Sequence, residues 1–109
     1  MTINLFEEFK VAFLNNANRC LGILKVSQGG IASTLVDNRL IFGPALKSGA
    51  CRIVLCHNHP SGKTDPSNAD LKLTKKIIAA GKLLDIEVLD HIILTEDNHL
   101  SFSRDGLIP

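Results

Sequence analysis

Alternating apolar and polar positions predict two strands in the first part of the chain. Residues 9–15, FKVAFLN, place a large apolar side chain at positions 9, 11 and 13, which is the period of a strand with one buried face. The NNAN segment that follows is typical of a turn. Residues 19–27, RCLGILKVS, then have the pattern of the return strand, closed by Gln28, Gly29 and Gly30. We therefore expect the chain to open with a pair of neighbouring strands.

Two later segments have helical spacing. Residues 37–48, DNRLIFGPALKS, begin with Asp and Asn, which favour the start of a helix. Pro44 lies in the middle of this segment, and proline removes a backbone donor and clashes with the preceding turn, so we expect a kink or two short helices. Residues 68–84 are predicted to form the longest helix.

Three further apolar runs predict strands and complete the fold class. Residues 51–57, CRIVLCH, are nearly continuous in apolar character, the pattern of a strand buried on both faces. Residues 87–95, EVLDHIILT, predict another strand, and residues 99–103, HLSFS, its partner in a final hairpin. A chain of 109 residues has room for one packed core. We expect one α/β (α+β) domain over residues 1–109, with a mixed β-sheet flanked by helices.

Composition and charge limit the cellular setting and the partners. Apolar residues make up 45% of the chain, enough for a folded core, and the net charge of +1 gives no global electrostatic argument for a nucleic-acid or membrane partner. Three cysteines without a C-x-x-C motif argue against a disulfide framework and favour a reducing cytoplasm. The N-terminus lacks the pattern of a signal peptide, and no run approaches the roughly 20 apolar residues of a membrane span. We expect a cytoplasmic protein that does not bind membranes.

The segment LCHNHPSGKTDPSNAD, residues 55–70, carries the candidate chemistry. His57 and His59 follow an apolar strand two residues apart, so their side chains point to the same face if the extended conformation continues. Asp70 lies near the start of the next helix, on the side of its apolar stripe, where a carboxylate needs a partner. The three side chains can converge beyond the end of the strand. Two imidazoles and one carboxylate form a zinc ligand set that leaves a fourth position open for water.

Simpler interpretations of the same residues remain. Two histidines at the end of a strand are more often an ordinary satisfied or exposed pair than a metal site. Ser67 and Asp70 are also spaced as a capping box, in which each side chain accepts a hydrogen bond from the other's backbone N–H. For Ser67 a cap and a ligand contact are compatible, whereas for Asp70 the cap and the metal ligand compete as interpretations. A cap alone explains neither histidine.

The spacing of these residues resembles that of a known family. His57-x-His59, seven further residues, Ser67, two more and Asp70 match the H-x-H-x7-S-x2-D signature of the JAMM (JAB/MPN) metalloprotease domain. The segments HNHPSG, PSNAD, AAGKLLDIEVLDHIILTED and SFSRDGL are similar to the bacterial RadC family, a branch of that superfamily. The resemblance extends from about Leu5 to Leu107.

This resemblance implies a set of roles. His57, His59 and Asp70 would bind Zn²⁺, and Glu8, before the first strand, would be the general base, with Glu7 as the near alternative. Ser67 would donate a hydrogen bond to the oxyanion. The implied activity is hydrolysis of a peptide or isopeptide bond in a peptide or protein substrate of unknown identity.

The resemblance also supplies the alternative function. Longer RadC-type proteins resemble a fusion with a helix-hairpin-helix module that grips DNA, and we expect no such module in this chain, so nucleic-acid binding by this domain should be weak or absent. The alternative is a non-catalytic RadC-type module, associated with DNA repair or binding another protein. The sequence leaves the oligomeric state open, a homodimer included.

Other polar residues are weaker candidates. Asp90 and His91 resemble a RadC-specific dipeptide and are better explained as a buried structural pair or as support for the site than as catalytic groups. Lys63 and Asp65, in the loop between two prolines, either gate the site or are simply exposed. One face of the long helix carries basic residues that favour a solvated surface over a phosphate site: Lys72, Lys75 and Lys76.

Overall fold

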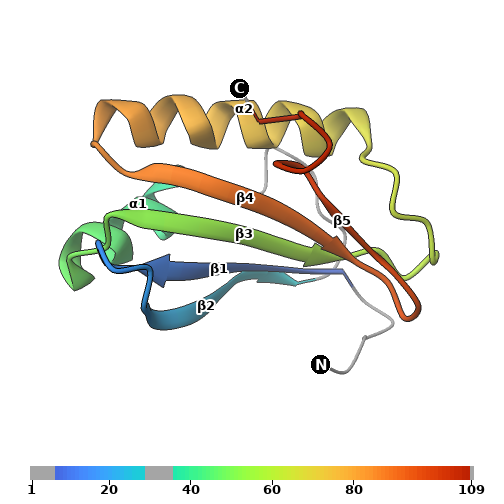
Figure 1. The fold of residues 1–109 in the computed structure, drawn as a ribbon, viewed down its shortest axis with the longest axis horizontal. Coiled ribbons are helices and arrows are strands. Elements are labelled where there is room, and N and C mark those ends of the chain that lie inside the picture. The colour runs from blue at the N-terminus through green and yellow to red at the C-terminus, as the bar shows by residue number, and fades with distance from the viewer. Residues whose placement is uncertain (1–6, 29–35, 109) are drawn as a thin grey trace.

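The computed structural model describes residues 7–28 and 36–108, and within these ranges it contains a single mixed sheet and two helices (Figure 1). The elements in chain order are β1 (Glu8–Leu14), β2 (Cys20–Gln28), α1 (Asn38–Ser48), β3 (Arg52–Asn58), α2 (Asn68–Leu83), β4 (Glu87–Leu94) and β5 (His99–Ser101). The predicted α+β class and the order of its elements are confirmed. Gly29 and Gly30, predicted to close the second strand, lie outside the described residues.

The sheet brings the end of β3 beside the start of α2. The strand order is β2-β1-β3-β4-β5, with β3 and β4 parallel and the other neighbours antiparallel. A parallel pair of strands needs a crossover connection. Helix α2 follows β3 and precedes β4 in the chain, and it supplies this connection by running back along the sheet (Figure 1). The loop of residues 59–67 therefore connects the carboxyl end of β3 directly to the first turn of α2.

One face of the sheet forms the core with both helices. In β1 the alternate residues Phe9, Val11 and Phe13 are buried, as the sequence pattern predicts. The core also contains side chains from β3 and from both helices, namely Ile53, Leu55, Ile41, Phe42, Leu73 and Ile77. The other face is only partly covered, so β3 alternates between half-buried and buried positions. The prediction that this strand is buried on both faces is wrong, because its second row of residues is only half-buried and, within residues 7–28 and 36–108, both helices contribute to the core on the other face.

A bulge in β4 decides which of its polar residues faces the core. Ile53 pairs with Val88, but the next residue, Val54, pairs with Asp90, so β4 contains one extra residue at this point. The extra residue reverses the alternation, and His91 takes the core face opposite Leu55. His91 is fully buried, whereas Asp90 is half-buried.

Helix α1 is continuous through its proline. Asp37 caps its start by accepting a hydrogen bond from the Arg39 N–H at 2.9 Å, and Gly49 ends it with φ 75°, in the left-handed region. Pro44 lies inside this single helix, so of the two predicted outcomes the pair of short helices is wrong, and the kink stays a prediction. Proline at position 44 removes the bond to the Leu40 carbonyl, and Leu40 is half exposed, which lets water take that place. Among the described residues no helix has the length and apolar character needed to cross a membrane.

Candidate metal centre

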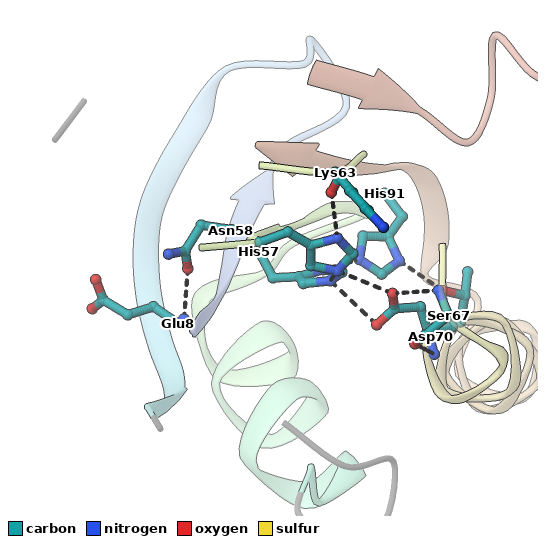
Figure 2. Close-up of polar contacts among 9 residues, drawn as sticks. Glu8, His57, Asn58, Lys63, Ser67, Asp70 and His91 are labelled. Carbon is teal, nitrogen blue, oxygen red and sulfur yellow. Dashed lines mark hydrogen bonds and ion pairs between the residues drawn. The ribbon is translucent and has the colours of Figure 1, made fainter. Parts of the chain in front are cut away.

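The end of β3 brings His57 to the side of Asp70 (Figure 2), and His59 follows two residues later. His57 is the last core-facing residue of the strand and is 2% exposed. The backbone N–H of His59 donates to the Leu94 carbonyl at 2.8 Å, so the pairing with β4 continues past the end of the strand. The extended conformation therefore holds to residue 59, and both imidazoles project toward the start of α2.

The capping box of α2 directs Asp70 toward these histidines. Ser67 is the N-cap residue and accepts a hydrogen bond from the Asp70 N–H at 3.0 Å. The Ser67 N–H in turn donates to Asp70 Oδ2 at 2.9 Å. A carboxylate has lone pairs on both oxygens, so this bond leaves Asp70 free to face the histidines as well. The sequence left the cap and the metal ligand as competing interpretations of Asp70, whereas in the structure the cap and the contacts with both histidines are present together.

The donor atoms of the three side chains converge. His57 Nε2 lies 3.2 Å from Asp70 Oδ1, His59 Nε2 lies 3.2 Å from Asp70 Oδ2, and the two Nε2 atoms are 2.9 Å apart. Atoms that bind one zinc ion tetrahedrally at ~2.0–2.1 Å are about 3.3 Å from one another. The contacts to Asp70 reach its two different oxygens, and with one ligand atom taken from each residue the three atoms lie within 4.8 Å of one another. His57, His59 and Asp70 are thus close enough to hold a metal ion.

Each imidazole also has a partner on its far side. His59 Nδ1 lies 2.9 Å from the backbone carbonyl of Lys63. His57 Nδ1 lies 2.7 Å from Nε2 of His91 in β4, and His91 Nδ1 lies 2.6 Å from the hydroxyl of Thr74. The rings are thus fixed from behind, as is usual for histidines that bind metals.

Two groups of the centre have displaced pKa values. Burial alone would raise the pKa of the Asp70 carboxyl, but hydrogen bonds with His57 and with the Ser67 N–H outweigh it and hold this pKa well below its usual range. Burial lowers the pKa of His91 to about 3, so His91 is neutral at pH 7. The centre therefore contains one carboxylate and a neutral supporting imidazole.

The proposed base, Glu8, is not brought to the three ligands. Its carboxylate lies 3.5 Å from the Lys25 ammonium, and Figure 2 shows it pointing away from His57 and Asp70. The backbone N–H of Glu8 donates to the Asn58 side chain at 2.6 Å, which fixes the start of β1 beside β3. The role of Glu8 as general base stays a prediction, with Glu7, which precedes β1, as the near alternative.

Ser67 combines its cap with an accessible hydroxyl. Its oxygen accepts the Asp70 N–H, and the residue is exposed at the mouth of the centre. Within residues 7–28 and 36–108, no protein group accepts the hydroxyl hydrogen. Ser67 can therefore donate to a molecule bound next to Asp70 while it caps the helix.

The remaining polar candidates divide between structure and surface. Asp90 accepts hydrogen bonds from the His91 N–H at 2.8 Å, the Ser101 hydroxyl at 2.6 Å and the Ser103 N–H at 2.9 Å, so it fixes the turn after β5. Sequence reasoning missed Thr74; its position four residues after Asp70 was the available signal. The remaining charged candidates of the loop and of α2 are exposed, namely Lys63, Asp65, Lys72, Lys75 and Lys76.

The fold and the donor set together define a small α+β domain with a His-His-Asp centre at the junction of a strand and a helix. The family model of the RadC-like JAB domain matches residues 1–107, and the chain belongs to this family. Three curated relatives are each called UPF0758 protein. The protein from Flavobacterium johnsoniae is 52% identical over 93% of this chain and 44% of its own length. Those from Syntrophomonas wolfei and Trichodesmium erythraeum are 40% and 43% identical over 94% and 90% of this chain, and over 43% and 40% of their own lengths. The chain spans less than half the length of these relatives.

Proposed function

We propose that this domain is a zinc-dependent hydrolase of peptide or isopeptide bonds. The observation that carries the proposal is the convergence of two Nε2 atoms and a carboxylate at separations of 2.9 to 3.2 Å. Two histidines and one carboxylate are a ligand set of catalytic zinc sites, which keep a fourth position for water or substrate. Membership of the RadC-like JAB family agrees with this donor set.

The chain's own residues supply binding and proton handling around such an ion. Zinc, when bound, would act as a Lewis acid and lower the pKa of water to about 7. Ser67 would donate its free hydroxyl hydrogen to the oxygen of the substrate carbonyl as that oxygen becomes negative, a contact typically worth 10²–10³-fold in rate. A glutamate at the start of β1 would accept the proton of the attacking water and deliver it to the leaving amine.

The two glutamates at the start of β1 form a matched pair for testing the base. Glu7→Gln and Glu8→Gln each remove one carboxylate without changing side-chain length, and neither residue is in the proposed ligand set. We expect the variant that lacks the base to lose at least about 10²-fold in hydrolysis while binding one equivalent of zinc, and the other to stay near the wild-type rate. Hydrolysis of zinc-loaded protein on fluorogenic peptides and on peptides with a lysine isopeptide bond measures this. Full activity in both variants would show that neither glutamate is the base.

One observation favours the alternative, a metal-binding module without catalysis. The ion pair of Glu8 with Lys25 directs the carboxylate expected from the family resemblance away from the centre. Protein that binds stoichiometric zinc, yet hydrolyses none of the test peptides faster than its Asp70→Asn variant, would support this alternative.

A further inference from the structure

We propose that His91 is a positioning residue of the metal centre: from its place between His57 and Thr74 it keeps the proton of His57 on Nδ1, so that Nε2 retains its lone pair for an ion. The inference rests on the metal centre proposed above, and it does not depend on hydrolysis. It assigns a function to a histidine that belongs to a different strand from the ligands and does not face the donor cluster itself.

The direction of each hydrogen bond follows from one group that can only accept. The backbone carbonyl of Asp70 has no hydrogen, so the Thr74 hydroxyl, 2.8 Å away, donates to it. With its hydrogen used, the Thr74 oxygen acts as acceptor toward His91 Nδ1 at 2.6 Å, and that nitrogen therefore carries the hydrogen. A neutral imidazole has one hydrogen, so His91 Nε2 is an acceptor.

The acceptor role of His91 Nε2 fixes the position of the hydrogen on His57 in the metal centre. His57 Nδ1 lies 2.7 Å from the acceptor Nε2 of His91 and must carry a hydrogen itself. A neutral His57 then has no hydrogen on Nε2, and this nitrogen, which faces Asp70, has the lone pair that can bind an ion. The series of contacts starts at the backbone carbonyl of Asp70 and ends at its carboxylate, so two of the three proposed ligands are connected by it.

The surroundings of His91 make this arrangement rigid. The residue is 0% exposed, so water cannot replace either of its partners. Its ring stacks on the Phe102 ring at a centroid distance of 4.4 Å and packs against the Phe9 ring in a T-shaped arrangement at a centroid distance of 5.7 Å. Phe9 in turn stacks on His57 at 5.9 Å. Rotation or flipping of the His91 ring would break these contacts as well as the hydrogen bonds.

The two ligand histidines are held in different ways, which makes the proposal testable. The partner of His59 is the backbone carbonyl of Lys63, which no side-chain substitution removes. The partner of His57 is a side chain that depends on a second side chain, Thr74. Substitutions at residues 74 and 91 therefore change the support of His57 and leave the partner of His59 in place.

Thr74 offers a matched pair of variants. Thr74→Val has nearly the same shape but no hydroxyl, so His91 Nδ1 loses its acceptor and the other tautomer, with its hydrogen on Nε2, becomes favourable. That hydrogen would point at His57 Nδ1 and push the proton of His57 to Nε2, where it competes with zinc. Thr74→Ser keeps the hydroxyl. We expect Thr74→Val to weaken zinc binding about 10–100-fold and Thr74→Ser to stay within a few-fold of wild type.

A second pair tests His91 directly. His91→Phe keeps an aromatic ring between Phe9 and Phe102 but has no acceptor, whereas His91→Gln places an amide that can accept from His57 Nδ1. The exposed His99, changed to Gln, controls for the loss of a histidine. Zinc dissociation constants from competition with a chelator at one pH should rank wild type and His99→Gln as tightest, His91→Gln next and His91→Phe weakest.

Histidine tautomers give a measurement that a structural role alone would not change. Long-range ¹H–¹⁵N spectra of the zinc-free protein report which ring nitrogen is protonated, and we expect the hydrogen of His57 on Nδ1 in wild type and Thr74→Ser and a shift toward Nε2 in Thr74→Val. A wild-type His57 without a hydrogen on Nδ1, or equal zinc affinity of folded Thr74→Val and Thr74→Ser, would overturn the inference. Wild-type protein that binds zinc with the expected tautomer but hydrolyses nothing would refute the hydrolase and leave the inference standing.

Discussion

Asp70 shows at the scale of one residue how a structural and a chemical role can share a carboxylate. Oδ2 accepts the Ser67 N–H of the capping box, and both oxygens face an imidazole of the centre. The cap requires only an acceptor, whereas a metal ion requires negative charge and a strong oxygen donor. An amide in place of the carboxylate keeps the acceptor that the cap requires and removes the negative charge that a metal ion requires.

Asp70→Asn should therefore weaken zinc binding far more than it weakens the helix. The Asn side chain can still accept the cap hydrogen bond, so the loss of stability without zinc should be at most about 0.5–2 kcal/mol. Added zinc should raise the melting temperature of the wild type and leave that of the variant unchanged, because only a state that binds the ion is stabilised by it. Melting curves with and without zinc measure the effect, and an equal shift in both proteins would exclude Asp70 as a ligand.

The burial of His91 predicts a pH dependence of stability. Its pKa is lowered to about 3 by burial, against an ordinary value near 6.5, so between these pH values the unfolded chain binds a proton that the folded protein does not. Falling pH then favours unfolding, by up to about 1.4 kcal/mol per pH unit from this group, and the contribution is complete only above pH 6.5. In the presence of chelator, the stability difference between wild type and His91→Gln should shrink from pH 7 to pH 4 in urea titrations. A constant difference would contradict the burial of a neutral His91.

At the scale of elements, the β3-α2-β4 unit holds the centre in place. The end of β3 positions His57 and, one residue past the strand, His59. The first turn of α2 supplies Asp70, and β4 supplies His91 behind His57. The far end of the helix is anchored by Gly81, whose carbonyl accepts the Ile86 N–H at 2.8 Å just before β4 begins. A Cβ at Gly81 would overlap the Ile86 carbonyl oxygen.

Gly81→Ala should therefore destabilise the domain, although alanine is the better helix residue. The turn between α2 and β4 must move to make room for the methyl group, and such overpacking typically costs about 1–3 kcal/mol. Gly22 in the edge strand β2 is the matched control, because nothing lies within 4 Å of its Cβ position. Gly22→Ala should be neutral or slightly stabilising. Chemical denaturation measures the free energy of unfolding of both variants. Equal values for Gly81→Ala and Gly22→Ala would show that the turn between α2 and β4 moves without loss of stability.

At the scale of the whole molecule, the balance of basic and acidic residues affects non-specific binding to DNA. Twelve basic and eleven acidic residues leave a net charge of +1. We expect such a chain to neutralise few phosphates on duplex DNA, and most of the affinity of non-specific binding comes from that neutralisation. Lys72, Lys75 and Lys76 of α2 are exposed to solvent.

Binding of this domain to duplex DNA should accordingly be weak and sensitive to salt. We expect no half-saturation below about 10 µM duplex at physiological ionic strength, and a loss of the residual signal when salt is raised. Fluorescence anisotropy with duplexes of different sequence measures this. Tight binding that depends on sequence would contradict the expectation and favour the DNA-associated alternative.

The sequence by itself determined the features that depend on spacing along the chain. The alternation in residues 9–13 fixed the buried face of β1, and the segment from His57 to Asp70 predicted three side chains that the structure brings together. Both predictions depend on regular geometry, because a strand repeats every two residues and the start of a helix is marked by its cap. Local pattern was a weaker guide at Pro44, where the solvent side of α1 tolerates a missing hydrogen bond.

Only the tertiary structure decided which residues meet across the sheet. The bulge in β4 turns His91 rather than Asp90 toward His57, and no local signal in residues 87–95 marks where the extra residue falls. Thr74 gains its role because α2 crosses over β4 at that position. The carboxylate of Glu8 faces Lys25 for the same reason, since strand pairing and register place its side chain beside β2. These contacts join residues far apart in sequence, and their register is set by the packing of the whole core, which spacing along the chain does not encode.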